Sequence, residues 1–242
     1  MRSDFCKKEK GNITIEFALM VATCVLVAAI FGVIYGVVRN YIKNQYVSRY
    51  KDASGILIQA IKSSQADNGK LTSWNYTSAQ TQDKFARTYI VPYMNVAKDC
   101  RTKKGEGCFE KDTYYKYLNG TKSGAVIDDT EAYKFINREG MSFYIKFIPN
   151  CVENMQRCID IYVDVNGPKR GPSQFGRDLF LFYVYPFTNE IKPFGTYSND
   201  KQAYDSYTNH WARYPYPSDC KRGGWGATCG TKLMIDGFEM NY

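Results

Sequence analysis

The chain contains one long stretch without any charge, from Phe17 to Val38, close to its N-terminus. As a helix this stretch would span roughly 33 Å at about 1.5 Å per residue, which is enough to cross a bilayer. A short charged segment, Met1–Gly11, precedes it and carries three lysines. Positive residues before a span favour an N-terminus held in the cytoplasm. The sequence therefore predicts a membrane anchor with most of the chain on the far side of the membrane.

Two simpler interpretations of this segment fit less well. A cleaved secretory signal has an apolar core of about 7–15 residues, whereas this run is longer and continues without proline into another helical pattern. A plain single-span anchor leaves Glu16 unexplained. A carboxylate just inside an apolar segment is unfavourable in lipid and usually has a partner.

Gly11 is followed by Asn-Ile-Thr-Ile and then by Glu16, and this pattern resembles the prepilin signature of type IV pilins and pseudopilins. The resemblance implies that a prepilin peptidase of the membrane removes residues 1–11 by cutting between Gly11 and Asn12. It also implies N-methylation of Asn12, although the first mature residue in that family is usually Phe or Met. Glu16 would be the fifth mature residue and would neutralise the amine of Asn12 in a neighbouring subunit during assembly.

Helical periodicity continues beyond the apolar run. Apolar residues recur there at steps of three and four: Tyr41, Ile42, Tyr46, Tyr50, Ala53, Ile56, Leu57, Ala60 and Ile61. Asn68-Gly69 is a plausible stop, because Gly tolerates the left-handed turn at a helix end. We predict one helix from near Ile13 to about Ala66, with an apolar part at 12–38 and an amphipathic part at 39–69. Gly32 and Gly36 form a small-xxx-small step that permits close helix contact.

The remainder of the chain changes from a helical to a strand period. Residues 70–140 are polar and broken by turn signals, with short helical stretches expected at 78–87 and 129–136. Alternating residues beyond Met141 predict strands, and we place these at 141–148, 159–165, 177–185 and 232–236. Strands in a row after a long helix point to an α+β fold, in which the helix packs on an antiparallel sheet within residues 141–242.

Two segments of this second half also resemble pilin-type subunits. One is the loop from Asp164 to Phe180, and the other is the C-terminal segment from Cys229 to Tyr242. Together the resemblances imply a pilin-like fold and a structural subunit of a type IV pilus-like filament. The subunit would be held in the inner membrane before assembly and polymerised by inner-membrane machinery into a helical homo-oligomer, as an extracellular pilus or a periplasmic pseudopilus.

Three alternatives stay open at this stage. A pseudopilin of a type II secretion system would share the N-terminus, and Glu16–Leu19 also resembles the tight-adherence class of subunits. A membrane-anchored extracytoplasmic binding domain is the alternative that forms no filament. The sequence does not distinguish a major from a minor subunit, nor roles in adhesion, twitching motility, DNA uptake or secretion.

Six of the 8 cysteines lie beyond the apolar run, in three close pairs: Cys100, Cys108, Cys151, Cys158, Cys220 and Cys229. An even set outside the membrane indicates disulfide bonds in an oxidising compartment. Six cysteines allow 15 connectivities, of which we favour the three local ones because each pair brackets loop-forming residues. A zinc site is disfavoured, since zinc sites favour closer Cys spacing with His nearby and this chain has a single His.

Other chemistry has little support in the sequence. Asp164, Asn166 and Asp178 are weak calcium candidates, since they offer oxygen ligands without the spacing of an EF-hand. The net charge of +8 permits contact with acidic surfaces, but no basic run interleaves with aromatics, so nucleic-acid binding is not indicated.

We predict no enzymatic activity, because the chain has neither a nucleophile motif nor a phosphate-binding glycine loop. The acidic cluster at 128–131 suits a helix start better than a catalytic carboxylate pair. The tyrosine-rich segment 204–216 is interpreted either as core and loop or as a binding surface.

Overall fold

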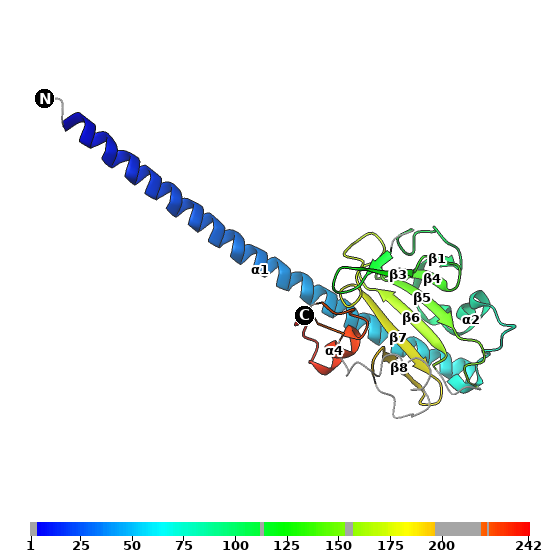
Figure 1. Ribbon diagram of the computed structural model, residues 1–242. Coiled ribbons are helices and arrows are strands. Elements are labelled where there is room, and N and C mark those ends of the chain that lie inside the picture. Colours follow the sequence, from blue (N-terminus) through cyan, green and yellow to red (C-terminus); the bar gives the residue numbers. More distant parts are fainter. Residues whose placement is uncertain (1–3, 112–113, 153–156, 197–218, 222) are drawn as a thin grey trace. The chain divides into compact units, whose positions relative to one another are not determined.

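Helix α1, Asp4–Asn68, is a single α-helix of 65 residues and the longest element of the described chain (Figure 1). The computed structural model describes residues 4–111, 114–152, 157–196, 219–221 and 223–242, and the side chains of α1 from Ile15 onward. The chain divides into two compact units, the N-terminal unit (residues 1–44) and the globular unit (residues 45–242). Helix α1 contributes residues to both units.

Helix α1 begins earlier than the sequence predicted and ends where it predicted. The expected start near Ile13 is wrong, because the helix already includes the charged segment before Gly11. Lys and Glu in that segment are good helix formers, and one Gly inside a helix lowers its stability by only about 1 kcal/mol. At the other end Gly69 has φ +79°, and its N–H donates to the carbonyl of Gln65 at 3.0 Å. This left-handed glycine terminates the helix.

A six-stranded antiparallel sheet forms the centre of the globular unit (Figure 1). Its strand order is β1-β4-β5-β6-β7-β8. The strands are β1 Val96–Arg101, β4 Tyr133–Asn137, β5 Ser142–Phe147, β6 Ile159–Asp164, β7 Leu179–Tyr185 and β8 Glu190–Pro193. The predicted strands at 141–148, 159–165 and 177–185 are confirmed as β5, β6 and β7, whereas β1 and β8 were not predicted.

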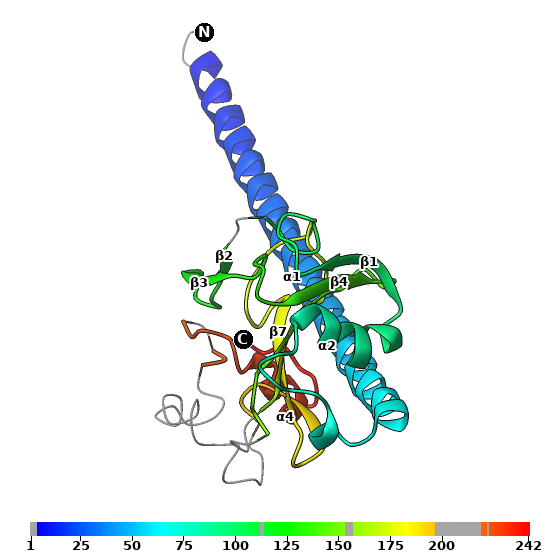
Figure 2. The same ribbon diagram turned by 90° about the vertical axis from the view of Figure 1, so that its right-hand side faces the viewer.

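One face of the sheet packs against the amphipathic part of α1. In the globular unit α1 buries a stripe of residues at helical spacing: Val47, Tyr50, Ala53, Leu57, Ala60, Ile61 and Ser64. The ring of Tyr50 lies 4.6 Å from that of Phe180 and 5.7 Å from that of Phe182, both on β7. Helix α2, Gln82–Tyr89, is a short helix of the globular unit (Figure 2). It joins the same core, where the Phe85 ring stacks on that of Phe147 at 4.7 Å. The helix predicted at 78–87 is present, but it begins and ends later, at Gln82 and Tyr89.

The opposite face of the sheet is also buried, in a second cluster that includes Tyr115 of β2 (Tyr114–Lys116) and Ile127, which follows β3 (Lys122–Val126). Successive residues of β7 point to opposite faces, so Phe180 and Phe182 enter the first core while Leu181 and Tyr183 enter the second. This arrangement explains why β7 is apolar and aromatic along its whole length. The fold is α+β, as the order of sequence patterns predicted.

Two predicted elements have the opposite secondary structure. The helix expected at 129–136 is wrong, because residues 133–137 form strand β4 in register with β5. The strand expected at 232–236 is also wrong, because Cys229–Ile235 form helix α4. Gly230 allows this helix to approach α1 closely: the Tyr50 hydroxyl donates to the Gly230 carbonyl at 2.8 Å, and an added Cβ would lie 3.1 Å from that hydroxyl.

Three disulfide bonds join the local cysteine pairs that the sequence favoured. Cys100–Cys108 closes a loop after β1, Cys151–Cys158 closes the connection between β5 and β6, and Cys220–Cys229 ties the segment before α4 to the start of that helix. Their Cα–Cα distances are 6.2, 5.2 and 4.9 Å. Each closes a short loop, and in this way constrains the chain on both sides of the sheet.

A buried ion pair connects β4 to the first disulfide loop. The side chains of Lys134 and Asp128 are 0% and 1% exposed, and Lys134 Nζ lies 3.2 Å from Asp128 Oδ1. The other oxygen, Asp128 Oδ2, accepts a hydrogen bond from the Gly105 N–H at 2.7 Å. Lys134 also donates to the Asp129 carbonyl. The acidic cluster thus supplies partners for a buried lysine instead of starting a helix.

We expect Asp128→Ala to destabilise the globular unit by about 3–5 kcal/mol, because the substitution leaves the Lys134 charge buried without its counter-charge. The measurement is urea unfolding of the detergent-solubilised protein, followed by fluorescence. Glu131→Ala is the matched control: it removes an exposed carboxylate that pairs with Lys146, and the unfolding midpoint should not change. An equal effect of the two substitutions would contradict a structural role for the buried pair.

Candidate functional site

The N-terminal unit carries an uncharged helical surface that nothing in the described chain covers. The best 18-residue window of Ile15–Asn68 has a mean hydropathy of 2.8 and is 0% buried. Large apolar side chains stand out from the helix on every side; Phe17, Phe31 and Val33, for example, are 67%, 67% and 68% exposed. This helix is long and apolar enough to cross a membrane. Water is a poor environment for so much apolar surface, so the helix requires lipid or protein around it.

The residues of the predicted processing and assembly site lie at the beginning of this surface. Gly11 and Asn12 are both within helix α1, and their side chains precede the part that the structure describes. Glu16 is exposed and forms no ion pair with any described residue. It is the one carboxylate at the edge of the uncharged run. In an apolar environment such a group is unfavourable unless a charged or hydrogen-bonding partner compensates it.

One feature of the apolar run, the glycine step at 32 and 36, suits contact with other helices. An added Cβ at Gly32 or at Gly36 would have nothing within 4 Å, so this small-residue face is open in the single chain. Cys24 is exposed and is the free cysteine among the described side chains. Small residues at a four-residue step allow helix backbones to approach closely in a membrane.

The predicted calcium ligands lie together at one end of β6 and β7, where they organise the loop between these strands. Asp164 accepts hydrogen bonds from the N–H groups of Asn166 and Gly167 at 3.3 and 3.0 Å, and from the Tyr115 hydroxyl at 2.5 Å. Asp178 accepts from the N–H groups of Ser173 and Gln174 at 2.7 and 2.6 Å. All four carboxylate oxygens therefore already have donors.

The third candidate, Asn166, uses its amide N–H to bind the Gly171 carbonyl at 3.1 Å. Its side-chain oxygen is buried without a partner. Among the described residues, no three His, Cys, Asp or Glu side chains are grouped closely enough to hold a metal ion. The carboxylates accept hydrogen bonds from N–H groups of their own loop and from the Tyr115 hydroxyl, so these bonds alone account for how the two side chains are held.

Burial governs the protonation of this pair of carboxylates. Burial raises the pKa of Asp164 well above its usual range, and the charge of the nearby Asp178 raises it further. Burial also raises the pKa of Asp178, from 3.8 to about 6, against the lowering effect of its backbone donors. Tyr115, which donates to Asp164, was not anticipated from the sequence, because it comes from β2 and its proximity depends on the tertiary fold.

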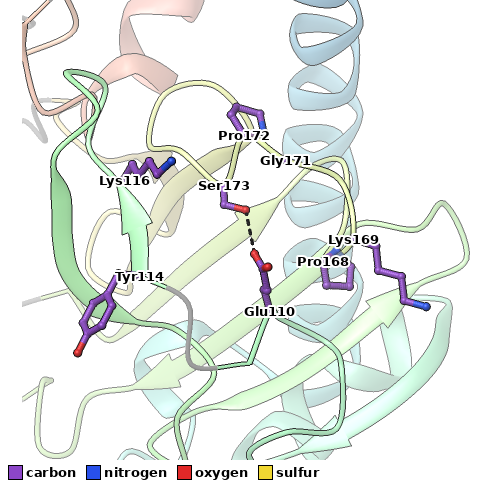
Figure 3. A pocket seen from close by; sticks show the side chains of 8 residues that line it. All are labelled: Glu110, Tyr114, Lys116, Pro168, Lys169, Gly171, Pro172 and Ser173. Carbon is purple, nitrogen blue, oxygen red and sulfur yellow. Dashed lines mark hydrogen bonds between the residues drawn. The ribbon is translucent and has the colours of Figure 1, made fainter.

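A shallow pocket of about 350 Å³ lies on the outer side of this loop, between it and β2 (Figure 3). Glu110 and Ser173 face one another there, with the Ser173 hydroxyl donating to Glu110 at 3.5 Å. Tyr114 and Lys116 of β2 line the other side, and Lys169 extends away from them (Figure 3). The pocket combines both signs of charge, with Glu110 against Lys116 and Lys169. The tyrosine-rich segment 204–216 lies outside the described residues.

We expect the stability of the globular unit to fall as the pH rises from 4 to 7. The pKa of Asp178 is higher in the folded state than in the unfolded state, so the folded state binds the proton more tightly. The stability gained in this way is lost as the pH rises from about 4 through about 6 and the folded-state carboxyl ionises. Asp178→Asn should reduce the loss of unfolding free energy by about 2 kcal/mol. Urea unfolding of both proteins at pH 4 and at pH 7 measures this loss of unfolding free energy. The exposed-site variant Asp52→Asn should keep the wild-type loss, and an unaltered pH dependence in Asp178→Asn would refute the assignment.

We expect EDTA to leave the melting temperature of the globular unit unchanged, because the oxygens of Asp164 and Asp178 already accept hydrogen bonds from the loop and from Tyr115. Differential scanning fluorimetry of the protein in EDTA, in buffer alone and with added calcium chloride checks this expectation. A melting temperature that falls in EDTA and recovers only with calcium would instead establish a calcium site in the protein.

The comparisons with known proteins add no relative. No protein-family model matches this chain, and neither a curated protein nor a solved structure matches it. The placement of the site residues is therefore known from the geometry of this chain alone.

Proposed function

We propose that this protein is a structural subunit of an extracytoplasmic filament of the type IV pilin class, polymerised through its N-terminal helix. The observation that carries the proposal is the position of Glu16 at the start of an uncharged and uncovered helical run. The subunit is first anchored in the inner membrane, where a prepilin peptidase removes residues 1–11. The mature subunit is then extracted from the membrane into a helical polymer.

The exposed apolar helix supports this proposal because it has only two suitable surroundings. In the membrane the lipid covers side chains such as Phe17 and Phe31, and in a filament identical helices cover them. The hydrophobic driving force does not distinguish strongly between these surroundings, since both are apolar. The helix can therefore move from lipid into the filament, provided that the charge of Glu16 is compensated.

Glu16 determines how the helices align when they move from lipid into the filament. Cleavage after Gly11 creates a positive amine on Asn12, four residues before the carboxylate. Two opposite charges in an apolar helix bundle attract strongly, and each is unfavourable there without the other. A pairing between Glu16 of one subunit and Asn12 of the next fixes the axial offset between neighbouring helices. Such a head-to-tail contact is heterologous and leads to an open helical filament.

The globular unit supports the proposal by being complete without the apolar run. Its core includes the amphipathic part of α1 and both faces of the sheet, and its three disulfide bonds stabilise the loops. A unit of this kind keeps its structure whether its N-terminal helix lies in lipid or among other helices. In the filament it faces outward.

We expect Glu16→Gln to abolish filaments while the protein stays in the membrane, because the substitution keeps the shape of the side chain and removes its charge. N-terminal sequencing of the wild-type subunit from sheared surface material should begin at Asn12. Electron microscopy counts the filaments, and immunoblotting of membranes checks that the variant is made in equal amount.

Asp52→Asn is the control, since it removes an exposed charge from the same helix outside the apolar run. Normal filaments in Glu16→Gln, or a mature N-terminus other than Asn12, would rule out the proposed assembly. If Glu16→Gln blocks secretion of other proteins and the wild type forms no surface filaments, the subunit builds a secretion pseudopilus. A membrane-anchored binding domain predicts that the substitution has no effect at all.

A further inference from the structure

A second hollow of the globular unit, with a volume of about 360 Å³, lies between α1, the edge strand β1 and two turns. We call it the basic pocket. Its charged lining comes from four separate segments of the chain: Arg49, Lys98, Glu139, Lys169 and Arg170. Four of these five groups are cations. None of them was singled out in the sequence, because they are far apart in the chain.

Arg49 is held in place without being neutralised. It is half-buried, and its Nη1 donates to the carbonyls of Val165 and Glu139 at 3.0 and 3.4 Å. Within the described chain no carboxylate forms an ion pair with it. Neutral carbonyls orient the guanidinium, but its positive charge persists at the pocket wall. A partly buried charge is usually paired, so a missing anion would complete this site.

Lys98 is positioned by the first disulfide loop. It lies on β1 just before Cys100, and the Cys100–Cys108 bond brings Gly107 back beside it. Gly107 has φ +76°, and a Cβ added there would lie only 3.2 Å from Lys98 Nζ. The Lys98 ammonium group therefore lies beside Gly107, where the backbone has no side chain. A covalent constraint thus holds the second cation at the pocket.

Lys169 and Arg170 complete the pocket from the turn that follows β6. This turn packs tightly on the neighbouring turn at 138–140, since a Cβ added to Gly167 would lie 2.4 Å from the Gly140 carbonyl oxygen. Both side chains are exposed. In the part of the chain that the structure describes, neither these two cations nor Lys98 forms an ion pair. Glu139 is the single acid among the lining residues and leaves a clear excess of positive charge.

We propose that the basic pocket binds a phosphate-type oxyanion, either free phosphate or the phosphate of an anionic lipid headgroup. Arg offers several N–H donors in a planar fork, and Lys offers a compact charge, so the two together suit the oxygens of a phosphate. The volume lies at the lower end of the range for small-molecule sites and leaves room for an attached glycerol group. This inference does not depend on filament assembly.

The test compares full-length proteins in an uncharged detergent. Inorganic phosphate is titrated against sodium chloride of equal ionic strength, while the melting temperature reports binding. The double variant Lys98→Ala/Arg170→Ala should weaken phosphate affinity at least tenfold. The control Lys62→Ala/Lys84→Ala removes two exposed lysines from α1 and α2, away from the pocket, and should bind phosphate as the wild type does.

Phosphate also stabilises proteins in general by exclusion from their surface, and this effect is the same in all three proteins. An equal rise in melting temperature for the wild type and the pocket variant would therefore overturn the proposal. Isothermal titration calorimetry of the wild type provides a second readout. It should give a saturable heat with phosphate that the pocket variant lacks.

Nanodiscs distinguish the two sources of the oxyanion. If a headgroup is the ligand, phosphatidylglycerol in a phosphatidylcholine disc should raise the melting temperature of the wild type but not of the pocket variant, and added phosphate should have no further effect. If free phosphate is the ligand, its effect on the wild type should be equal in discs with and without phosphatidylglycerol. Identical behaviour of wild type and pocket variant in every disc would contradict both.

Discussion

The apolar surface of helix α1 must be kept away from water, and this requirement determines what must surround each part of the helix. The amphipathic part of α1 buries its apolar stripe within the chain, where the Tyr50 ring packs on Phe180 and Phe182 and the Tyr50 hydroxyl donates to the Gly230 carbonyl. The apolar part leaves side chains such as Phe17 and Phe31 uncovered. No other described element covers this surface, so the apolar part of the helix requires lipid or protein around it. The proposed function follows from this unequal burial along one helix.

The globular unit combines a rigid sheet with loops that are fixed by different means. Disulfide bonds hold three loops, the Lys134–Asp128 pair anchors one of them to β4, and the Asp164 and Asp178 carboxylates cap the turn after β6 with their hydrogen bonds. Two of these loops meet at the basic pocket. The constraints that stabilise the loops therefore also bring separated cations together.

The sequence predicted what depends on local pattern and missed what depends on tertiary contacts. The uncharged run, the stop at Gly69 and the alternation in β5, β6 and β7 are local signals, and each corresponds to an element of the structure. The acid cluster before β4 resembled a helix start, but its Asp128 is the partner of a buried lysine. Helix α4 resembled a strand because Leu233-Met-Ile is apolar, and its fold depends on contacts with Tyr50. The basic pocket had no local signal, since Arg49 and Lys98 approach through the fold.

Electron cryomicroscopy of filaments sheared from the cell surface tests the central claim most directly. The account predicts a central bundle of parallel helices made of residues 12–38, globular units on the outside, and density joining Glu16 of one subunit to the N-terminal amine of another. A protein found only as a monomer in the membrane, with residues 1–11 still attached, would contradict it.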